Sequence, residues 1–228
     1  MFVIALATVM YEIVLTRIFS VTMWYHFAFV AISVAMFGMT AGALLIYLRP
    51  AVFTQERVHE HLTWGAVLFA VTAVISFLVG LFVPFEGDLS PGGILWAVLG
   101  YAIIATPFVF SGISVALALT KFPARVGTLY AFDLVGAAMG CLAVIVTLNV
   151  TDGPTAVLVV GALAGLAGVL FAVRATPRLR RVAIAVTVVL AAVAGLEAAL
   201  VRAQSPLLRL QWVKGNMEAR PLYEKWNS

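Results

Sequence analysis

The sequence predicts an all-α integral membrane protein: a bundle of seven transmembrane helices over residues 1–201, followed by a short soluble tail over residues 202–228. The first observation behind this prediction is composition, since 64% of the 228 residues are hydrophobic and only 11% are charged. Soluble domains carry about 25% charged residues, and their interiors cannot hold this much apolar surface. The second observation is that the apolar residues gather into seven runs, each near the roughly 20 residues needed to cross a bilayer.

The runs that we expect to cross the membrane are Phe2–Phe19, His26–Leu48, Leu62–Phe85, Gly92–Thr120, Thr128–Val150, Pro154–Val173 and Val182–Val201. The first run has no basic stretch before it and no small-residue cleavage site, so we expect a retained helix and not a signal peptide. The fourth is long enough to tilt or kink, and Pro107 in its middle gives the cause. The sequence Asp152-Gly153-Pro154 is typical of a turn followed by proline at the first position of a helix.

Basic residues lie in alternate loops. The second, fourth and sixth loops contain Arg49, Arg57, Lys121, Arg125, Arg174, Arg178, Arg180 and Arg181. The third loop and the fifth contain neither lysine nor arginine. The positive-inside rule then places the even loops and the N-terminus in the cytoplasm and the tail outside. The tail has five basic residues of its own, which favour the cytoplasmic side, so the sequence leaves the side of the tail open.

The net charge of +4 is therefore better explained by membrane topology than by a nucleic-acid partner. The single cysteine, Cys141, excludes an internal disulfide framework, and we expect it to be a small buried side chain.

Three runs carry pairs of glycines four residues apart. The pairs are Gly38 and Gly42, Gly136 and Gly140, and Gly161 and Gly165. In a membrane this spacing makes a smooth strip along one helix face and allows two backbones to approach closely. The pattern predicts a tightly packed bundle, in which these six glycines are helix-packing residues.

Two carboxylates lie inside apolar runs. Glu12 shares a helix face with Thr16, and Asp133 shares one with Tyr130 and the glycine pair that follows it. Because an ionisable residue inside a membrane helix is costly, it usually faces the bundle interior and has a partner. We expect that partner to come from another helix, with Arg17 the first candidate for Asp133. A polar clamp between helices and a functional carboxylate that binds a cation or relays protons both fit this pattern.

Recognisable catalytic, cofactor and metal motifs are absent from the sequence. It contains no phosphate-binding loop, dinucleotide-binding glycine motif, paired-cysteine motif or nucleophile elbow. His59 and His61 are two residues apart and so do not share a helix face, which argues against a metal site. We therefore expect no catalytic, cofactor-binding or metal-binding residues, and Glu12, Arg17, Tyr130 and Asp133 are the candidate functional residues of the membrane region.

Two polar-punctuated motifs carry a family resemblance. "YEIVLTRIFSVTMWYHFAFVAISVAMFGMTAGAL" and "RVGTLYAFDLVGAAMGCLAVI", with "PFVFSGISVALAL" between them, resemble the membrane half of bacterial spermidine-synthase-like integral membrane proteins. The resemblance covers roughly residues 8 to 175. It implies a bacterial inner-membrane location and a soluble Rossmann-like domain after the bundle, similar to aminopropyltransferases. An S-adenosylmethionine-type cofactor is implied only where that domain is present.

By this resemblance the tail is the start of a Rossmann-like domain whose catalytic part lies outside this chain. We expect a non-catalytic membrane module that serves as an anchor, scaffold or accessory subunit, without enzyme activity of its own. Its partners are then the lipid bilayer, other membrane subunits or its own soluble domain. The alternative is a small cation, polyamine or proton-coupled transporter that uses Glu12 and Asp133.

Overall fold

The structure, a computed structural model, describes residues 1–23, 28–82, 90–210, 212–213 and 216–217. Its helices are α1 (Phe2–Thr22), α2 (Ala28–Leu48), α3 (Val58–Phe82), α4 (Pro91–Lys121), α5 (Val126–Val150), α6 (Gly153–Phe171) and α7 (Pro177–Arg202). Short 3-10 turns, η2 (Pro123–Arg125) and η3 (Ala172–Arg174), precede α5 and α7. Two antiparallel strands of two residues each, β1 (Trp212–Val213) and β2 (Asn216–Met217), follow the bundle. Seven helices are long and apolar enough to cross a membrane, so the predicted all-α membrane bundle is confirmed.

Two helix starts follow from local capping chemistry. Ser90 caps α4 by accepting a hydrogen bond from the backbone N–H of Gly93 at 3.1 Å. Asp152 caps α6 in the same way, accepting from the N–H of Thr155 at 3.0 Å. Burial raises the pKa of the Asp152 carboxyl above its ordinary value and the hydrogen bond from the Thr155 N–H opposes the rise, so this cap carries a desolvation cost.

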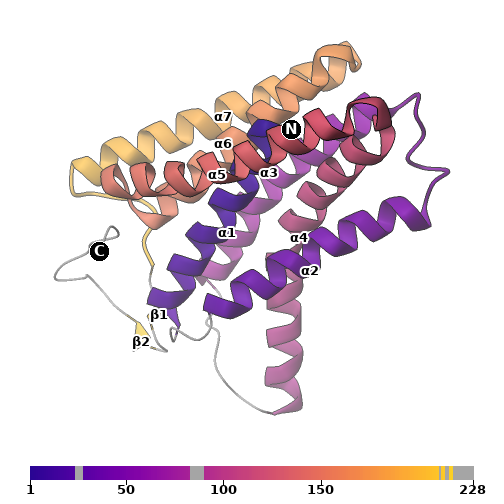
Figure 1. The fold of residues 1–228 in the computed structure, drawn as a ribbon. Coiled ribbons are helices and arrows are strands. Elements are labelled where there is room, and N and C mark those ends of the chain that lie inside the picture. Colours follow the sequence, from indigo (N-terminus) through magenta and orange to yellow (C-terminus); the bar gives the residue numbers. More distant parts are fainter. Residues whose placement is uncertain (24–27, 83–89, 211, 214–215, 218–228) are drawn as a thin grey trace.

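The longest helix, α4, runs through Pro107 without ending there. Proline has no N–H to donate and its ring crowds the preceding turn, so it bends a helix in which it is embedded. Figure 1 shows the two halves of α4 running in different directions, with the N-terminal half projecting away from the bundle. The sequence expectation that Pro107 marks a bend in the fourth run agrees with this view.

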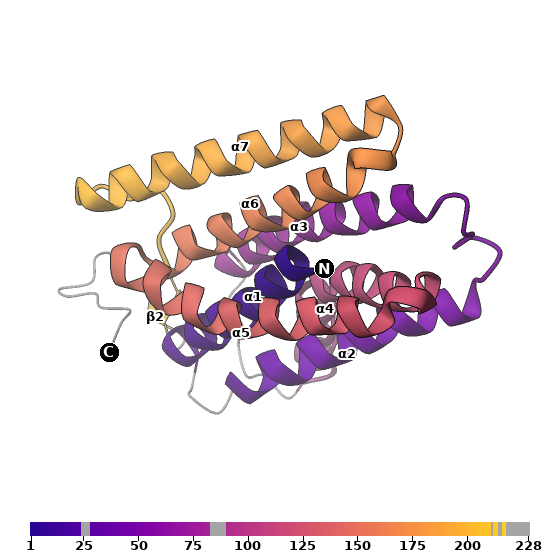
Figure 2. The same ribbon diagram turned by 45° about the horizontal axis from the view of Figure 1, so that its top comes forward.

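At the centre of the bundle, α1 packs against α5, α6, α2 and α4, while α3 packs against α6, α4 and α7. Helices α2 and α7 lie on opposite edges (Figure 2). Helices α1 and α5 run in the same direction, since Gly136 lies beside Phe2 and Gly140 beside Leu6.

The loops that the sequence marks as basic lie at one end of the bundle. The side-chain amide of Gln55, before α3, donates to the carbonyl of Lys121 at the end of α4, at 3.1 Å. The ring of His59 lies 5.9 Å from that of Phe122 and also near the Arg174 guanidinium. We call this end the basic end; the α5–α6 turn and the segment after α7 lie at the opposite end.

Each of the six predicted packing glycines lies where another helix approaches closely. A Cβ atom at Gly38 would lie 2.6 Å from the carbonyl oxygen of Ala105 in α4, and one at Gly140 would lie 2.7 Å from that of Leu6 in α1. Cβ atoms at Gly42 and Gly136 would collide with backbone atoms of α4 and α1, whereas those at Gly161 and Gly165 would meet side chains of α3 and α7. The pairs in α2 and α5 therefore allow close contact between two helix backbones. The pair in α6 allows side chains of α3 and α7 to pack closely against that helix.

The outward faces of α2, α5 and α7 are apolar, as contact with lipid requires. The expectation of a buried Cys141 is wrong, because this cysteine is exposed on α5. Its neighbour Gly140 faces α1, and successive residues of a helix point about 100° apart, so Cys141 is turned away from that contact.

Adding a single methyl group at Gly136 tests the α1–α5 contact. The substitution Gly136→Ala places a Cβ against the Phe2 carbonyl and should cost about 1–3 kcal/mol of overpacking. This exceeds the roughly 0.5–1 kcal/mol that alanine adds through helix propensity. We expect a lower free energy of unfolding in detergent titrations.

The matched control is Gly195→Ala on α7, where no atom of another helix lies within 4 Å of the added methyl group. This substitution should leave stability unchanged or slightly higher. Equal losses at the two positions would contradict the close-packing role of Gly136.

Candidate functional site

Buried hydroxyl groups join three helices in the core. On α1, Thr8 and Tyr11 are 3% and 0% exposed and lie on one face. The Thr8 hydroxyl donates to the carbonyl of Ile4 at 2.7 Å and lies 2.5 Å from the hydroxyl of Ser111 on α4. Because a hydroxyl has one proton, Ser111 is the donor in that second bond.

The hydroxyl of Tyr11 donates to the carbonyl of Ala73 on α3, at 3.1 Å. Its ring packs at 6.0 Å from that of Phe69 on α3 and at 5.2 Å from that of Phe108 on α4. We call Thr8, Tyr11, Phe69, Phe108 and Ser111 the Tyr11 cluster. It contains neutral groups, without an acid, a base or a cation, so its chemistry is suited to fastening α1, α3 and α4.

The four candidate residues from the sequence do not converge. Glu12 is half-buried on α1, and its carboxylate makes no hydrogen bond or ion pair with the described residues. Arg17 is exposed near the far end of the same helix, and Tyr130 is 53% exposed on α5. Asp133, one turn after Tyr130, is half-buried.

The expected pairing of Asp133 with Arg17 is wrong. Gly136 lies beside Phe2 in the parallel pair of α1 and α5, so Asp133 is level with the start of α1. Arg17 lies fifteen residues beyond Phe2 and Asp133 lies three residues before Gly136. This offset of eighteen residues, at 1.5 Å per residue, places the two positions about 27 Å apart along the bundle.

The two intramembrane carboxylates are also separated from each other. Glu12 lies ten residues after Phe2, and Asp133 lies three residues before the glycine that faces Phe2. This offset of thirteen residues corresponds to about 20 Å along the bundle. Glu12 and Asp133 therefore cannot hold one ion or exchange a proton directly.

Glu197 on α7 is the buried carboxylate that our sequence reasoning missed. It is 2% exposed and accepts a hydrogen bond at 2.7 Å from the backbone N–H of Leu208, in the segment after α7. A signal was present, because Glu197 is the sole acidic residue of the run Val182–Val201.

A tight reversal at the end of α7 brings Leu208 back to Glu197. The N–H of Ser205 donates to the carbonyl of Leu200 at 2.9 Å and that of Gln204 to Val201 at 3.0 Å, which is the Schellman pattern of helix termination. The pattern requires a left-handed residue, and Gln204 adopts a φ of 58°.

The segment Ser205–Leu210, which we call the tail strap, is fixed to the bundle at more than one point. The side chain of Leu208 packs among residues of α3, α6 and α7, and Leu210 packs against the main core. The strap then reaches the C-terminal end of α1, where β1 makes contact (Figure 1). It thereby spans one end of the bundle from α7 to α1.

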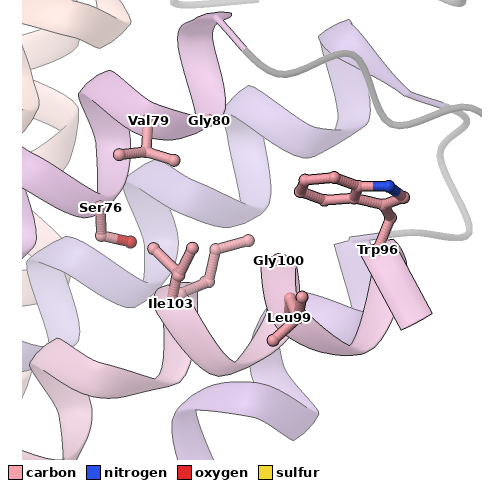
Figure 3. Close-up of a pocket in the computed structure, with 8 residues that line it drawn as sticks. Ser76, Val79, Gly80, Trp96, Leu99, Gly100 and Ile103 are labelled. Atoms are coloured by element: carbon pink, nitrogen blue, oxygen red, sulfur yellow. The ribbon is translucent and has the colours of Figure 1, made fainter.

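A small pocket lies between α3 and the projecting half of α4 (Figure 3). Its volume is about 90 Å³, and its lining residues are Ser76, Val79, Gly80, Trp96, Leu99, Gly100, Ile103 and Ile104. For comparison, an engineered apolar cavity of about 150 Å³ binds benzene. This pocket can therefore hold a few methylene groups of an acyl chain, and its described lining residues include no acid, base or metal ligand.

No group of three potential metal ligands occurs among the described residues. His59 and His61, in the first turn of α3, face different aromatic rings: His59 lies near Phe122, and His61 lies 5.2 Å from Phe53. Each of the two imidazoles therefore packs against a different aromatic ring.

Comparison with known proteins gives no family for this chain: no family model, no curated protein and no solved structure matches it.

A double-mutant cycle tests the bond between Thr8 and Ser111. The variants Thr8→Val, Ser111→Ala and their combination should show a coupling energy of about 0.6 kcal/mol, the average for hydrogen bonds between membrane helices. The measurement is the free energy of unfolding in detergent. As a control, Ser111→Ala combined with Thr40→Val should give no coupling energy. Thr40 is exposed, and its hydroxyl donates to the carbonyl of Met36 in its own helix. A zero value for the first pair would show that this contact does not fasten α1 to α4.

Limited proteolysis tests the Glu197 contact. The variant Glu197→Ala leaves the Leu208 N–H without its acceptor, so the tail strap should detach and trypsin should cut faster after Arg209. Cleavage after Arg202, already exposed at the end of α7, serves as the internal reference. Glu197→Gln keeps a side-chain oxygen acceptor and should give an intermediate rate. An unchanged rate after Arg209 in the alanine variant would show that Glu197 does not hold the strap.

Proposed function

We propose that this chain is a non-catalytic membrane module, similar to the membrane half of bacterial spermidine-synthase-like proteins, that anchors or scaffolds a soluble domain or a larger membrane assembly. The observation that carries the proposal is how the buried polar side chains are used. The Tyr11 cluster bonds neighbouring helices, and Glu197 bonds the tail strap. These groups stabilise the bundle and are not arranged around a substrate cavity.

The geometry of the helices supports the same proposal. Secondary transporters commonly bind their cargo near the bilayer midplane, where helices are interrupted and half-helix ends point at the ligand. The seven helices described here are each continuous, and α4 passes through Pro107 as one helix of 31 residues. An anchor needs only this stable frame.

The tail strap supports an anchoring role because it controls where the chain leaves the bundle. The Schellman turn, the bond to Glu197 and the packing of Leu208 set the path of residues 205–210 across the bundle end. In the proposal, the tail leads into a soluble Rossmann-like domain, and an S-adenosylmethionine-type cofactor belongs to that domain. The basic end is proposed to face the cytoplasm of a bacterial inner membrane.

One observation favours the alternative, a small cation, polyamine or proton-coupled transporter. The Glu12 carboxylate is half-buried within a membrane helix and has no partner among the described residues. Intramembrane carboxylates of this kind often mark ion or proton pathways. Asp133 lies about 20 Å away along the bundle, so in a transporter it would form a second, separate site on the pathway.

Reconstitution of the purified chain in proteoliposomes separates the two functions. If the chain is a non-catalytic module, uptake of labelled putrescine or spermidine should not exceed that of protein-free vesicles. Calorimetry with S-adenosylmethionine or its decarboxylated form should show no binding tighter than about 1 mM, which corresponds to roughly −4 kcal/mol.

Uptake that is lost in Glu12→Gln and kept in Glu56→Gln would instead establish the transporter. Glu56 is the matched control because it is exposed in the loop before α3. Tight binding of either nucleoside by this chain would contradict the module outright.

A further inference from the structure

Four arginines gather where α6 leads into α7. Arg174, Arg178, Arg180 and Arg181 lie within eight residues and are all exposed. None of them forms an ion pair with a carboxylate of the described residues, and the titratable neighbour of Arg174 is the imidazole of His59. This part of the basic end thus presents positive charge without compensation from the described protein.

Arginines at the N-terminus of α7 do not stabilise this helix. Three of the arginines lie within the first five residues of the helix, where the partial positive charge of the N-terminus makes cations unfavourable. The N-cap residue, Thr176, contributes no side-chain hydrogen bond, and no acidic residue occurs in the first turn. An anion from outside the protein would offset this accumulation of positive charge.

The remainder of α7 sets the depth of the arginines in the bilayer. The apolar run Val182–Val201 has 20 residues, so it spans about 30 Å, the thickness of the hydrocarbon core. Its outward face carries exposed aliphatic side chains such as Val182, Val188 and Val189. Helix α7 also forms one edge of the bundle (Figure 2), so lipid can reach it. The arginines therefore lie just beyond the hydrocarbon, at the level of the lipid phosphates.

We propose that the arginine cluster, Arg174, Arg178, Arg180 and Arg181, binds the phosphate headgroups of anionic phospholipids in its own leaflet. The acyl chains of these lipids lie along the exposed apolar face of α7. Guanidinium groups suit this role because their fixed fork of N–H donors matches two phosphate oxygens at once. The inference depends on η3 and α7 alone and is independent of the function proposed above.

The test compares lipids on the full chain in a neutral detergent. Phosphatidylglycerol and phosphatidylcholine with identical acyl chains are titrated, and thermal unfolding reports binding. Phosphatidylglycerol should raise the Tm of the wild-type chain more than phosphatidylcholine does. In the triple variant R178Q/R180Q/R181Q, affinity for phosphatidylglycerol should fall by about fivefold per arginine, or roughly a hundredfold in all. The variant R178K/R180K/R181K should retain part of the affinity, because lysine keeps the positive charge but lacks the paired N–H donors of the guanidinium group.

The matched control is R49Q/R57Q/R125Q, which removes the same charge from the other loops of the basic end. Its affinity for phosphatidylglycerol should stay within a few-fold of wild type. Each protein is compared between the two lipids, so a change in its intrinsic stability does not affect the result. Equal stabilisation of the wild type by both lipids, or an equal loss in the control, would overturn the proposal. So would stabilisation by inorganic phosphate as strong as that by phosphatidylglycerol, which would identify a free-anion site.

Discussion

Close contact between helix backbones is the constraint on which the rest of this structure depends. Lipid tails are as apolar as leucine side chains, so helices in a bilayer gain little from hiding apolar surface from one another. Association has to come from van der Waals contact and hydrogen bonds at short range. The glycines supply the first of these: Gly136 and Gly140 admit the backbone of α1, and Gly38 and Gly42 admit that of α4. With α1 held between α5 and α4, Thr8 and Tyr11 come within hydrogen-bonding distance of their partners.

The buried polar groups differ in what they do for the fold. The hydroxyls of Thr8, Tyr11 and Ser111 add direction to contacts that packing has already made close. Glu197 lies near the end of α7, and its carboxylate accepts a hydrogen bond from the backbone N–H of Leu208 in the tail strap. Without Glu197 this buried N–H would lose its acceptor. Glu12 has no comparable role among the described residues. It is therefore the residue at which a function beyond packing would be found first.

The two ends of the bundle are chemically different, and this difference underlies both proposals. The basic end carries charged loops, and its arginine cluster is placed at the depth of lipid phosphates. At the opposite end, the tail strap crosses from α7 to α1 and determines where the following residues emerge. A module with one end held at the lipid surface and the other fastened to a continuing chain would have a defined orientation in its membrane. That property suits an anchor better than a carrier, which must expose its site alternately to both sides.

The sequence by itself determined the number of helices, their approximate bounds and the start of the sixth helix near Pro154, because length, hydropathy and turn signals are properties of a single segment. It also identified the packing glycines, since a spacing of four residues defines one face of one helix. Only the tertiary structure decided which residues meet. The pairing of Asp133 with Arg17 was wrong because the sequence does not fix the level of one helix relative to another. The outward position of Cys141 was unforeseen because α5 is apolar on all sides, so its hydropathy does not separate a lipid-facing residue from a buried one. The bond from Leu208 to Glu197 likewise depends on a reversal at Gln204, a residue that rarely adopts a left-handed conformation. Contacts between distant segments depend on the level and rotation of whole helices, and these are set by the packing of all seven together.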